Sequence, residues 1–390
     1  MMKVLYVDVN ARFINPTRSL IACALLMRMD VRFFGPGFIS TSVLEDGLEA
    51  FVDSTGPYDV IIANSLFLFG DFSEVPLTLQ DFKENYAVKF GSSDVACIPD
   101  IARALEKIDG VKRVAFLLES DFYDWSERYV EALERRADVF VPLAGPEFWS
   151  ANADRPNLFR ESFASRATDC WFNFLQNRSR ACASMPHFIG DSEFNYTALQ
   201  SRSQDWSILG VKYAARRTAQ KILKDNGLGV DSGSKSRRFI GALKKAKLLK
   251  GETELTISYL NADFRARMAA SRYSYTCGSG LGMPIRKFFE IPAAGSVLVC
   301  QPFVGFAHAG FIDRENCIVC EPGDIIEVHH WLSADTDRAQ EIARNGQKLI
   351  AWKHSVSARA QEFYDIVSMV AVGRFNGATW RDGRFELSPA

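Results

Sequence analysis

The stretch SYTCGSGLGMPIRKFFEIPAAGSVLVC, residues 274–300, holds the local pattern that decides the fold. It begins with a β-type run that ends at Thr276 and then passes three glycines spaced by one residue. A helix is expected over residues 284–294, and a second apolar β-type run follows at 296–300. A buried strand, a glycine-rich turn, a helix and another buried strand form the repeating unit of a parallel sheet covered by helices.

The same alternation extends in both directions along the chain. Apolar runs without a polar face indicate strands buried on both sides. Strands are predicted over residues 3–9, 31–35, 59–63, 113–118, 138–141, 205–210, 274–276, 296–300 and 317–319, and helices over 16–29, 43–53, 100–108, 124–136, 213–226, 284–294 and most of 335–372. The pattern predicts an α/β protein with two doubly wound, Rossmann-like domains whose strand ends face a shared cleft.

The length of 390 residues also favours two domains, since single cores stop growing at roughly 250–300 residues. We expect an N-terminal domain over residues 1–195 and a C-terminal domain over 196–370. Residues 371–390 are expected to form a tail that packs back on the N-terminal domain. The boundary lies at the end of an irregular, aromatic-rich stretch, residues 143–205.

Composition narrows the class of protein. Hydrophobic residues make up 47% and the formal net charge is −1, which excludes wholesale disorder and does not favour a nucleic-acid partner. The N-terminus is acidic too early for a secretory signal, and no apolar run reaches the ~18 residues of a membrane span. The eight cysteines show no disulfide framework or metal-ligand spacing, so we expect reduced thiols in a cytoplasmic protein.

Residues 274–290 also predict an anion site. A loop with exposed backbone amides, Gly278, Ser279 and Gly280, follows the strand that ends at Thr276 and leads to a helix start, where unpaired N–H groups favour phosphate. Arg286 and Lys287 lie in the first turn of that expected helix, where two cations oppose the helix dipole and so indicate a negative group nearby. Glu290 lies about 9 Å along the axis from its start, so its carboxylate can accept both hydroxyls of a ribose.

These residues carry a family resemblance. The segment IRKFFEIPAAGSVLVC resembles the donor-site helix and next strand of group-1 type glycosyltransferases with the GT-B fold. Its single-glutamate pattern, R-x-F/Y-E-x-x-A-x-G, is similar to the spore-maturation-protein (CgeB-like) branch. The segment IARNGQKLIAWKHSVSARAQEF resembles the closing helices of the family, with His354 and Arg359 in an H-x(4)-R pattern. The resemblance is good over residues 205–370.

The resemblance implies a glycosyltransferase that uses a nucleotide-sugar donor, UDP-, GDP- or another, in cell-surface polysaccharide or glycoconjugate synthesis. Glu290 would bind the donor ribose, and Lys212 and Arg216 would balance the charge of the departing diphosphate. Many relatives carry a second glutamate where this chain has Gly282, which leaves the stereochemistry open. The resemblance implies metal-independent transfer, with no tightly bound cofactor, to a glycan or lipid-linked acceptor.

The N-terminal domain is expected to hold the acceptor. Asp121, with Glu119 as second choice, follows a predicted strand and would deprotonate the acceptor hydroxyl; both could instead cap the next helix. Asp8 is a strand-end alternative for the base. Loop residues Asn10 and Arg12, and His308 from the C-terminal domain, are weaker candidates for contacts with the acceptor or the donor sugar.

One charge feature stands apart. Residues 211–250 contain 12 Lys/Arg and 2 Asp, a net of +10. Within them, residues 235–250 (KSRRFIGALKKAKLLK) form a basic amphipathic segment. This segment either lies on an anionic membrane, giving a peripheral contact at the inner face, or is a solvated helix with its apolar stripe on the core.

Two other functions remain open from sequence. A sugar-nucleotide epimerase of the same fold would need paired acid and base carboxylates around the sugar, and Gly282 removes one candidate. A non-catalytic nucleotide-sugar-binding protein would keep Glu290 and Arg216 but lack a productive base.

Overall fold

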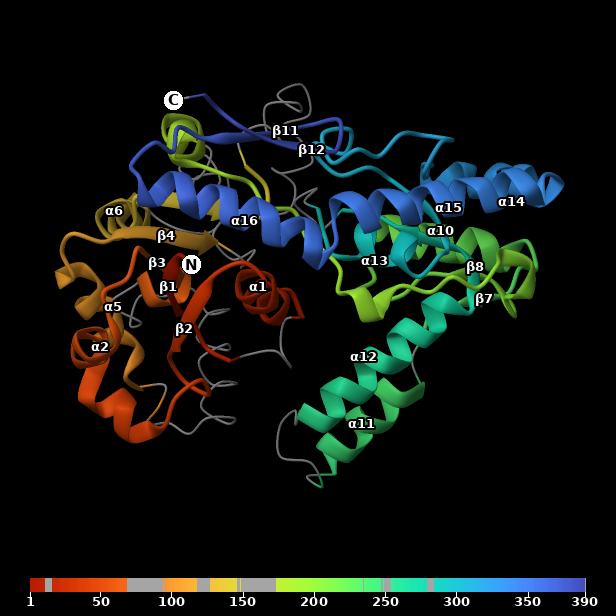
Figure 1. The fold of residues 1–390 in the computed structure, drawn as a ribbon. Coiled ribbons are helices and arrows are strands. Elements are labelled where there is room, and N and C mark those ends of the chain that lie inside the picture. The colour runs from red at the N-terminus through yellow and green to blue at the C-terminus, as the bar shows by residue number, and fades with distance from the viewer. Residues whose placement is uncertain are drawn as a thin grey trace.

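The computed structural model describes residues 1–10, 16–68, 94, 96–117, 127–145, 148, 173–233, 235–246, 248, 254–278 and 284–389. Within them, two five-stranded parallel sheets dominate the chain (Figure 1). The first contains β1 (Lys3–Val7), β2 (Asp30–Phe34), β3 (Val60–Asn64), β4 (Lys112–Leu117) and β5 (Val139–Pro142). The second contains β6 (Gln204–Ser207), β7 (Val230–Asp231), β8 (Ser271–Thr276), β9 (Val297–Cys300) and β10 (Ile318–Val319).

Both sheets have the same strand order. The first runs β2-β1-β3-β4-β5 and the second β7-β6-β8-β9-β10, so each sheet reads 2-1-3-4-5 in the order of its own strands. In such a sheet the chain reverses direction between its first and third strands, and ligands bind outside the strand ends at that switch point. The two switch points therefore lie between β1 and β3, and between β6 and β8.

Helices cover both faces of the first sheet because its strands alternate their apolar side chains. Val4 and Tyr6 of β1 pack in a cluster with α1 (Pro16–Leu26) and α16 (Val356–Ala371). Leu5 and Val7 face the opposite cluster, which includes side chains from α2 (Thr41–Thr55), α5 (Ile98–Lys107) and α6 (Glu127–Arg136). This two-residue alternation places β1 in the centre of a helix–sheet–helix sandwich.

The second sheet is covered in the same way. One face packs on α10 (Ala214–Asp225), α14 (Ile325–Ala334) and α15 (Thr336–Lys353) through a cluster around the fully buried Trp206. The other face meets α13 (Lys287–Ala293), whose Phe288 and Phe289 are also fully buried. Two further helices, α11 (Lys235–Lys245) and α12 (Glu254–Ala269), form a hairpin that extends away from β7 and β8 (Figure 1).

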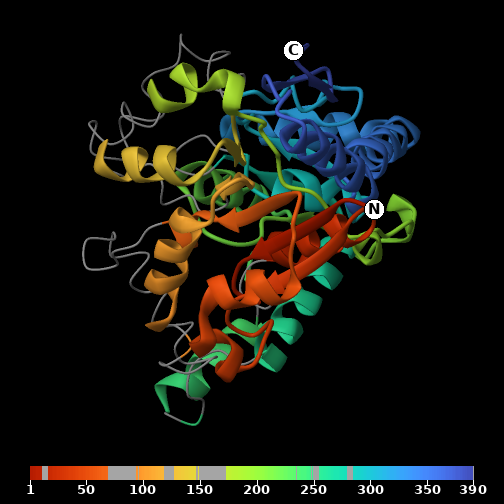
Figure 2. The ribbon, with the colours of Figure 1, turned by 60° about the vertical axis from the view of Figure 1, so that its left-hand side comes forward.

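The chain passes between the two units twice, and the two passages are hydrogen-bonded to each other. The amide of Ile189 donates to the His354 carbonyl at 2.8 Å, and the amide of Val356 donates to the Ile189 carbonyl at 3.0 Å. Beyond this crossing, α16 packs against α1 of the first unit. Figure 2 shows from a second side that the C-terminal segments (blue) lie together along one edge of the molecule.

His354 and Arg359, the H-x(4)-R pair, form the buried centre of this crossing. Arg359 donates to Nδ1 of His354 at 2.8 Å, so Nε2 carries the proton and donates to the Ala309 carbonyl at 2.8 Å. Burial and the neighbouring Arg359 lower the pKa of His354. Trp380 stacks on the imidazole with ring centroids 5.2 Å apart. A neutral imidazole therefore joins the loop after β9, the crossing and the C-terminal hairpin.

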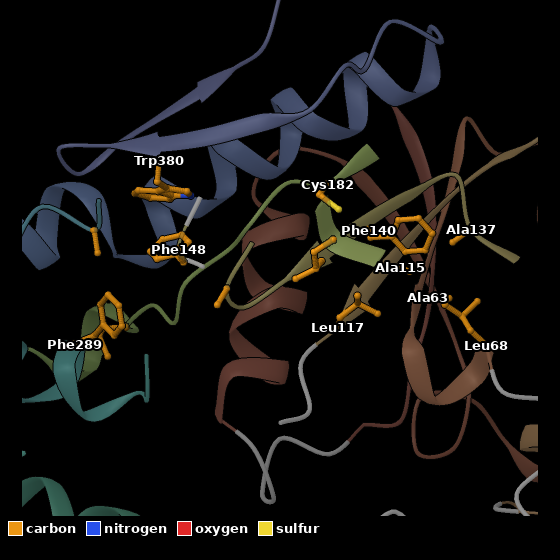
Figure 3. Close-up of a cluster of buried hydrophobic side chains, with 14 of the residues drawn as sticks. Ala63, Leu68, Ala115, Leu117, Ala137, Phe140, Phe148, Cys182, Phe289 and Trp380 are labelled. Atoms are coloured by element: carbon orange, nitrogen blue, oxygen red, sulfur yellow. The ribbon is translucent and has the colours of Figure 1, made fainter. Parts of the chain in front are cut away.

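The C-terminal hairpin contains β11 (Ala378–Arg381) and β12 (Arg384–Leu387). Its Trp380 indole N–H donates to the Ser184 carbonyl at 2.9 Å. Figure 3 shows Trp380, Phe148 and Phe289 near one another, and residues of the first sheet continue the same cluster. One hydrophobic core therefore runs without interruption from the first sheet to the second.

The predicted strands and most predicted helices are confirmed to within a few residues. The helix expected over residues 284–294 is shorter in the structure, where α13 begins at Lys287 and ends at Ala293. Its start is a tighter turn, because the amides of Phe288 and Phe289 donate to the carbonyls three residues earlier, Ile285 and Arg286. The two-residue strand β7, helix α12 and the β11–β12 hairpin were not predicted. No helix in the described ranges is long and apolar enough to span a membrane.

Candidate functional site

The switch point of the second sheet is built around Gly210, in the turn between β6 and α10. Gly210 has a φ of 91°, a conformation that side chains rarely adopt. A β-carbon at this position would lie 2.5 Å from Cε and 2.6 Å from Nζ of Lys287. The glycine therefore lets the first residue of α13 place its ammonium group directly on the turn after β6.

Arg216, from the first turns of α10, enters the same place and is 1% exposed. Its guanidinium donates to the Val211 carbonyl at 2.9 Å, to Thr276 Oγ1 at 2.6 Å and to the Cys277 carbonyl at 3.2 Å. These bonds join the loop after β6 to the loop after β8. In the part of the chain that the structure describes, no carboxylate pairs with Arg216.

The two cations converge on one point. Nη1 of Arg216 lies 3.6 Å, and Nζ of Lys287 2.6 Å, from the position of the missing Gly210 β-carbon. Burial lowers the pKa of Arg216, so its charged form is held at an energetic cost. Lys287 also lies over the Phe264 ring of α12, with Nζ 5.3 Å from the centroid. Two cations that meet at the ends of β6 and β8 could bind a multiply charged anion.

Arg286, one residue before Lys287, faces a different set of partners. Its guanidinium donates to Oε1 of Glu290 and, at 2.6 Å, to Oε1 of Glu193. Glu193 belongs to the segment that joins the two units, and all three side chains are 10–13% exposed. The two carboxylates raise the pKa of Arg286 against the lowering effect of its burial. Arg286 is therefore the centre of a carboxylate–guanidinium–carboxylate bridge.

Glu290 also opens into a cavity of about 170 Å³. The cavity lies between the joining segment, with Glu193 and Asn195, and the end of α12, with Arg265 and Ala266. No described residue donates a hydrogen bond to Oε2 of Glu290, since Arg286 bonds Oε1. The glutamate thus lines a pocket on the α12 side of α13 and has one carboxylate oxygen that no described residue binds.

The other predicted donor residues are less informative. Thr276 is fully buried and accepts from Arg216. Lys212 is exposed, and its carbonyl accepts from Arg217 at 2.8 Å. Gly278 ends a described range. Ser279 and Gly280 lie outside the described residues.

On the N-terminal side, the predicted bases Asp121 and Glu119, and Arg12, lie outside the described residues. Asn10 donates to the Gly37 carbonyl at 3.1 Å, which joins the loops after β1 and β2. Asp8, the strand-end alternative to Asp121 and Glu119 for the base, is 1% exposed.

Asp8 has a full set of structural partners. It accepts from Tyr6 and from the Val9 amide, each at 2.8 Å, and pairs with Arg18 at 3.3 Å. Burial raises the pKa of Asp8 while Arg18 lowers it. These contacts account for the carboxylate as an anchor between β1 and α1, because burial requires such partners.

His308 lies where the two units meet. Its ring is edge-on to Phe148, with centroids 6.3 Å apart, and its carbonyl accepts from the Gly383 amide at 3.0 Å. These contacts place His308 at the junction of the loop after β9, the N-terminal unit and the C-terminal hairpin.

His187 is a residue near the site that sequence reasoning did not select. Its Nδ1 lies 3.1 Å from Thr17 Oγ1 in α1, and its ring is 6.5 Å from that of Phe289 in α13. Burial first, and then Arg286, Lys287 and Arg359, lower the pKa of His187 to about 3. His187 is therefore a neutral imidazole between the two units and close to the cations of the candidate site.

Comparisons with known proteins agree with this architecture. Residues 251–365 match the model of a family described as glycosyl transferase-like. A sucrose-phosphate synthase from Thermosynechococcus elongatus is similar in structure at a TM-score of 0.53 and 10% identity, over 96% of this chain and 100% of that one. Among curated protein sequences, none matches significantly.

Two further solved structures are similar at lower scores. HepE from Anabaena, in complex with UDP and glucose, covers 94% of this chain and 100% of its own at 14% identity and a TM-score of 0.49. A glycosyltransferase from Rickettsia africae covers 95% and 98% at 11% identity and a TM-score of 0.47. The predicted GT-B class is confirmed by the full-length structural match, and the predicted glycosyltransferase is confirmed as a glycosyl transferase-like domain over residues 251–365.

Proposed function

We propose that the protein transfers a sugar from a nucleotide-sugar donor to a hydroxyl acceptor, with the donor diphosphate bound between Arg216 and Lys287. The observation that carries this proposal is the convergence of both cations on Gly210, at the switch point between β6 and β8. Lys287 lies inside the glycosyl transferase-like region, residues 251–365. Arg216 reaches it from α10 in the preceding βα unit.

Glu290 is proposed to bind the donor ribose. Lys287 and Glu290 are three residues apart on α13, so they share a helix face and are about 4.5 Å apart along the axis. Both face α12, Lys287 at Phe264 and Glu290 at the cavity with Arg265. A nucleotide whose diphosphate lies at Lys287 would thus reach the Glu290 pocket with its ribose.

Arg286 is proposed to position Glu290 rather than to bind phosphate. Its bond to Oε1 of Glu290 fixes the carboxylate and leaves Oε2 for the ribose hydroxyls. Glu193 is the second carboxylate bound to Arg286, so the guanidinium is shared between Glu193 and Glu290. The phosphate contact that the sequence predicted for Arg286 is assigned in this proposal to Lys287.

Charge stabilisation of the leaving group is the proposed source of catalysis. When the sugar leaves, negative charge grows on the nucleoside diphosphate, and cations that are already in place stabilise it without reorganisation. Arg216 is held by three hydrogen bonds, so it is such a fixed cation. Lys212, Thr276 and the loop residues Gly278, Ser279 and Gly280 complete the proposed phosphate site, and we propose that transfer needs no metal.

The acceptor side remains a proposal from sequence. Asp121, or Glu119, would deprotonate the acceptor hydroxyl, with Asn10, Arg12 and His308 as acceptor or sugar contacts. The acceptor is proposed to be a glycan or a lipid-linked sugar, and the enzyme to act in the cytoplasm in glycoconjugate synthesis. We also propose that the protein belongs to the spore-maturation-protein (CgeB-like) branch and that its donor is a UDP-, GDP- or other nucleotide sugar.

A thermal-shift panel tests this function. UDP, GDP, ADP, CMP and dTDP are compared on wild type, Glu290→Gln and the exposed-site control Glu327→Gln. A matching nucleotide raises the melting temperature at concentrations well above its Kd. We expect one nucleotide to stabilise wild type and the control, and Glu290→Gln to lose most of the shift.

Assays with a sugar nucleotide of the stabilising base then distinguish a transferase, an epimerase and a binding protein. Slow donor hydrolysis in the absence of acceptor supports a transferase, whereas formation of an epimerised sugar identifies an epimerase. Binding without turnover, in the presence of candidate acceptors, identifies a binding protein. If no nucleotide stabilises wild type, the proposed site is wrong.

A further inference from the structure

The α11–α12 hairpin carries large apolar side chains that the protein core does not cover. Phe239 of α11 is 64% exposed, Leu248 just beyond it 73%, and Leu255 at the start of α12 82%. Leu248 and Leu255 both lie near the end where the two helices are joined, and that end points away from β7 and β8 (Figure 1). Exposed leucines at the free end of a projecting hairpin favour contact with another apolar phase.

Helix α12 is apolar on more than one side. Ile257 and Met268 are buried. Leu255, Tyr259 and Ala262 are exposed, and their spacing of four and three residues places them on one stripe of the first half of α12. A helix of a soluble core usually presents polar side chains to water on its outer face. Here an exposed apolar stripe begins at the free end of the hairpin and extends over the first half of α12.

The positive charge of the hairpin favours an anionic partner. Residues 235–250 contain seven Lys/Arg and no Asp or Glu, in a chain with a net charge of −1. Arg238 and Lys245 are exposed on α11 beside Phe239. Cationic side chains near exposed apolar ones fit an anionic lipid surface, where each Lys or Arg near the surface strengthens binding about fivefold.

We propose that the α11–α12 hairpin docks the protein on an anionic lipid bilayer, with Leu248 and Leu255 entering the interface. The structure extends the basic segment that the sequence indicated into a two-helix surface that includes α12. Of the described apolar residues of this segment, Ile240 at 7% exposure, and in part Leu243, fit the alternative of a stripe that lies on the core. This proposal rests on exposure and charge and is independent of the donor site.

Vesicle flotation tests the proposal with the full chain. Vesicles of 30% phosphatidylglycerol in phosphatidylcholine are compared with pure phosphatidylcholine. We expect wild type to float with the anionic vesicles only, and more weakly at high salt. Leu248→Ser with Leu255→Ser should lower the partition coefficient at least tenfold, and Arg238→Gln with Lys245→Gln about thirtyfold.

Matched controls separate the hairpin from general surface properties. Trp352→Ser with Val372→Ser removes two side chains that are 72% and 64% exposed on other elements. Arg344→Gln with Lys348→Gln removes the same charge from the exposed side of α15. Both controls should partition like wild type, and circular dichroism should show all variants folded.

Three results would overturn the proposal. One is a wild type that stays with the soluble fraction. Another is a loss of binding that is equal in the hairpin variants and the controls. The third is a wild-type dimer by light scattering that Leu248→Ser with Leu255→Ser dissociates, without vesicle binding, since that would show a second copy on the same surface.

Discussion

Lys287 lies against Gly210 so closely that a β-carbon on the glycine would be 2.6 Å from the lysine nitrogen. This contact joins two βα units across the switch point of the second sheet, and it fixes a cation where the turn after β6 exposes its backbone. The glycine and the lysine thus depend on each other. The conformation of one determines whether the other can occupy the crevice.

The first prediction tests this dependence with Gly210→Ala. The new methyl group must displace Lys287, so donor nucleotide affinity should fall at least tenfold by calorimetry. Gly227→Ala is the matched control, because Gly227 also has a positive φ, 76°, but nothing lies within 4 Å of its added β-carbon. Both variants should lose about 1–2 kcal/mol of unfolding free energy from backbone strain. Equal nucleotide affinity in the two variants would contradict the account.

Arg216 gives the second prediction. Arg216→Lys keeps a charge but cannot reproduce three hydrogen bonds to two different loops. We expect about 1–3 kcal/mol of lost stability in chemical denaturation and a clear loss of nucleotide affinity. The neighbouring Arg217, which is exposed, should tolerate the same change within about 0.5 kcal/mol. A variant at Arg216 as stable and as active as the one at Arg217 would refute the role of its bonds.

The Arg286 bridge gives the third prediction. Glu193→Gln removes a carboxylate whose partner Arg286 is only 13% exposed, and should cost about 1–3 kcal/mol in unfolding free energy. Nucleotide affinity should fall several-fold as well, because Arg286 then binds Glu290 alone. Glu341→Gln breaks a pair whose side chains are 41% and 55% exposed, and should cost less than about 1 kcal/mol. Nucleotide binding that is unchanged in Glu193→Gln would remove Glu193 from the proposed site.

The fourth prediction concerns pH. The pKa of His187 is lowered to about 3 in the folded protein, against 6.5 as its ordinary value. Between these values the unfolded chain binds the proton more strongly, so this group lowers the stability as pH falls below 6.5. Glu362 acts in the opposite direction, since burial raises its pKa to about 6 and its contribution is lost as pH rises through that value.

Melting temperatures at pH 7.5 and 5.0 separate the two groups. His187→Gln should lose less stability on acidification than wild type, and Glu362→Gln should lose more. An identical pH dependence in His187→Gln and wild type would show that the imidazole is not held neutral between the two units.

The strands of the two parallel sheets, apart from β7, could be predicted from sequence because buried parallel strands leave short, continuous apolar runs. Strand β7 has only two residues, both partly exposed, and leaves no such run. The long hairpin helix α12 could not be predicted either, since its apolar residues lie on several sides and give no helical period. Leu255 and Tyr259 are large apolar residues in sequence, yet their side chains are 82% and 58% exposed.

The site was predictable in part. Glu290 and Arg216 follow from the βα pattern and the family resemblance, but the choice between Arg286 and Lys287 depends on where α13 begins. A start at residue 284 places both in the first turn, whereas the observed start at Lys287 turns Arg286 toward Glu193 and Lys287 toward Gly210. Glu193 and His187 could not be found from sequence, because their partners are about 90 and 170 residues away along the chain.

The central claim is that Arg216 and Lys287 hold the diphosphate of the donor. Calorimetric titration with the nucleoside diphosphate that stabilises the protein, and with the corresponding nucleoside monophosphate, tests it most directly. Wild type and Lys348→Met should prefer the diphosphate at least tenfold, and Lys287→Met should bind both ligands with nearly equal, weak affinity. A Lys287→Met protein that keeps the full preference for the diphosphate would contradict the claim.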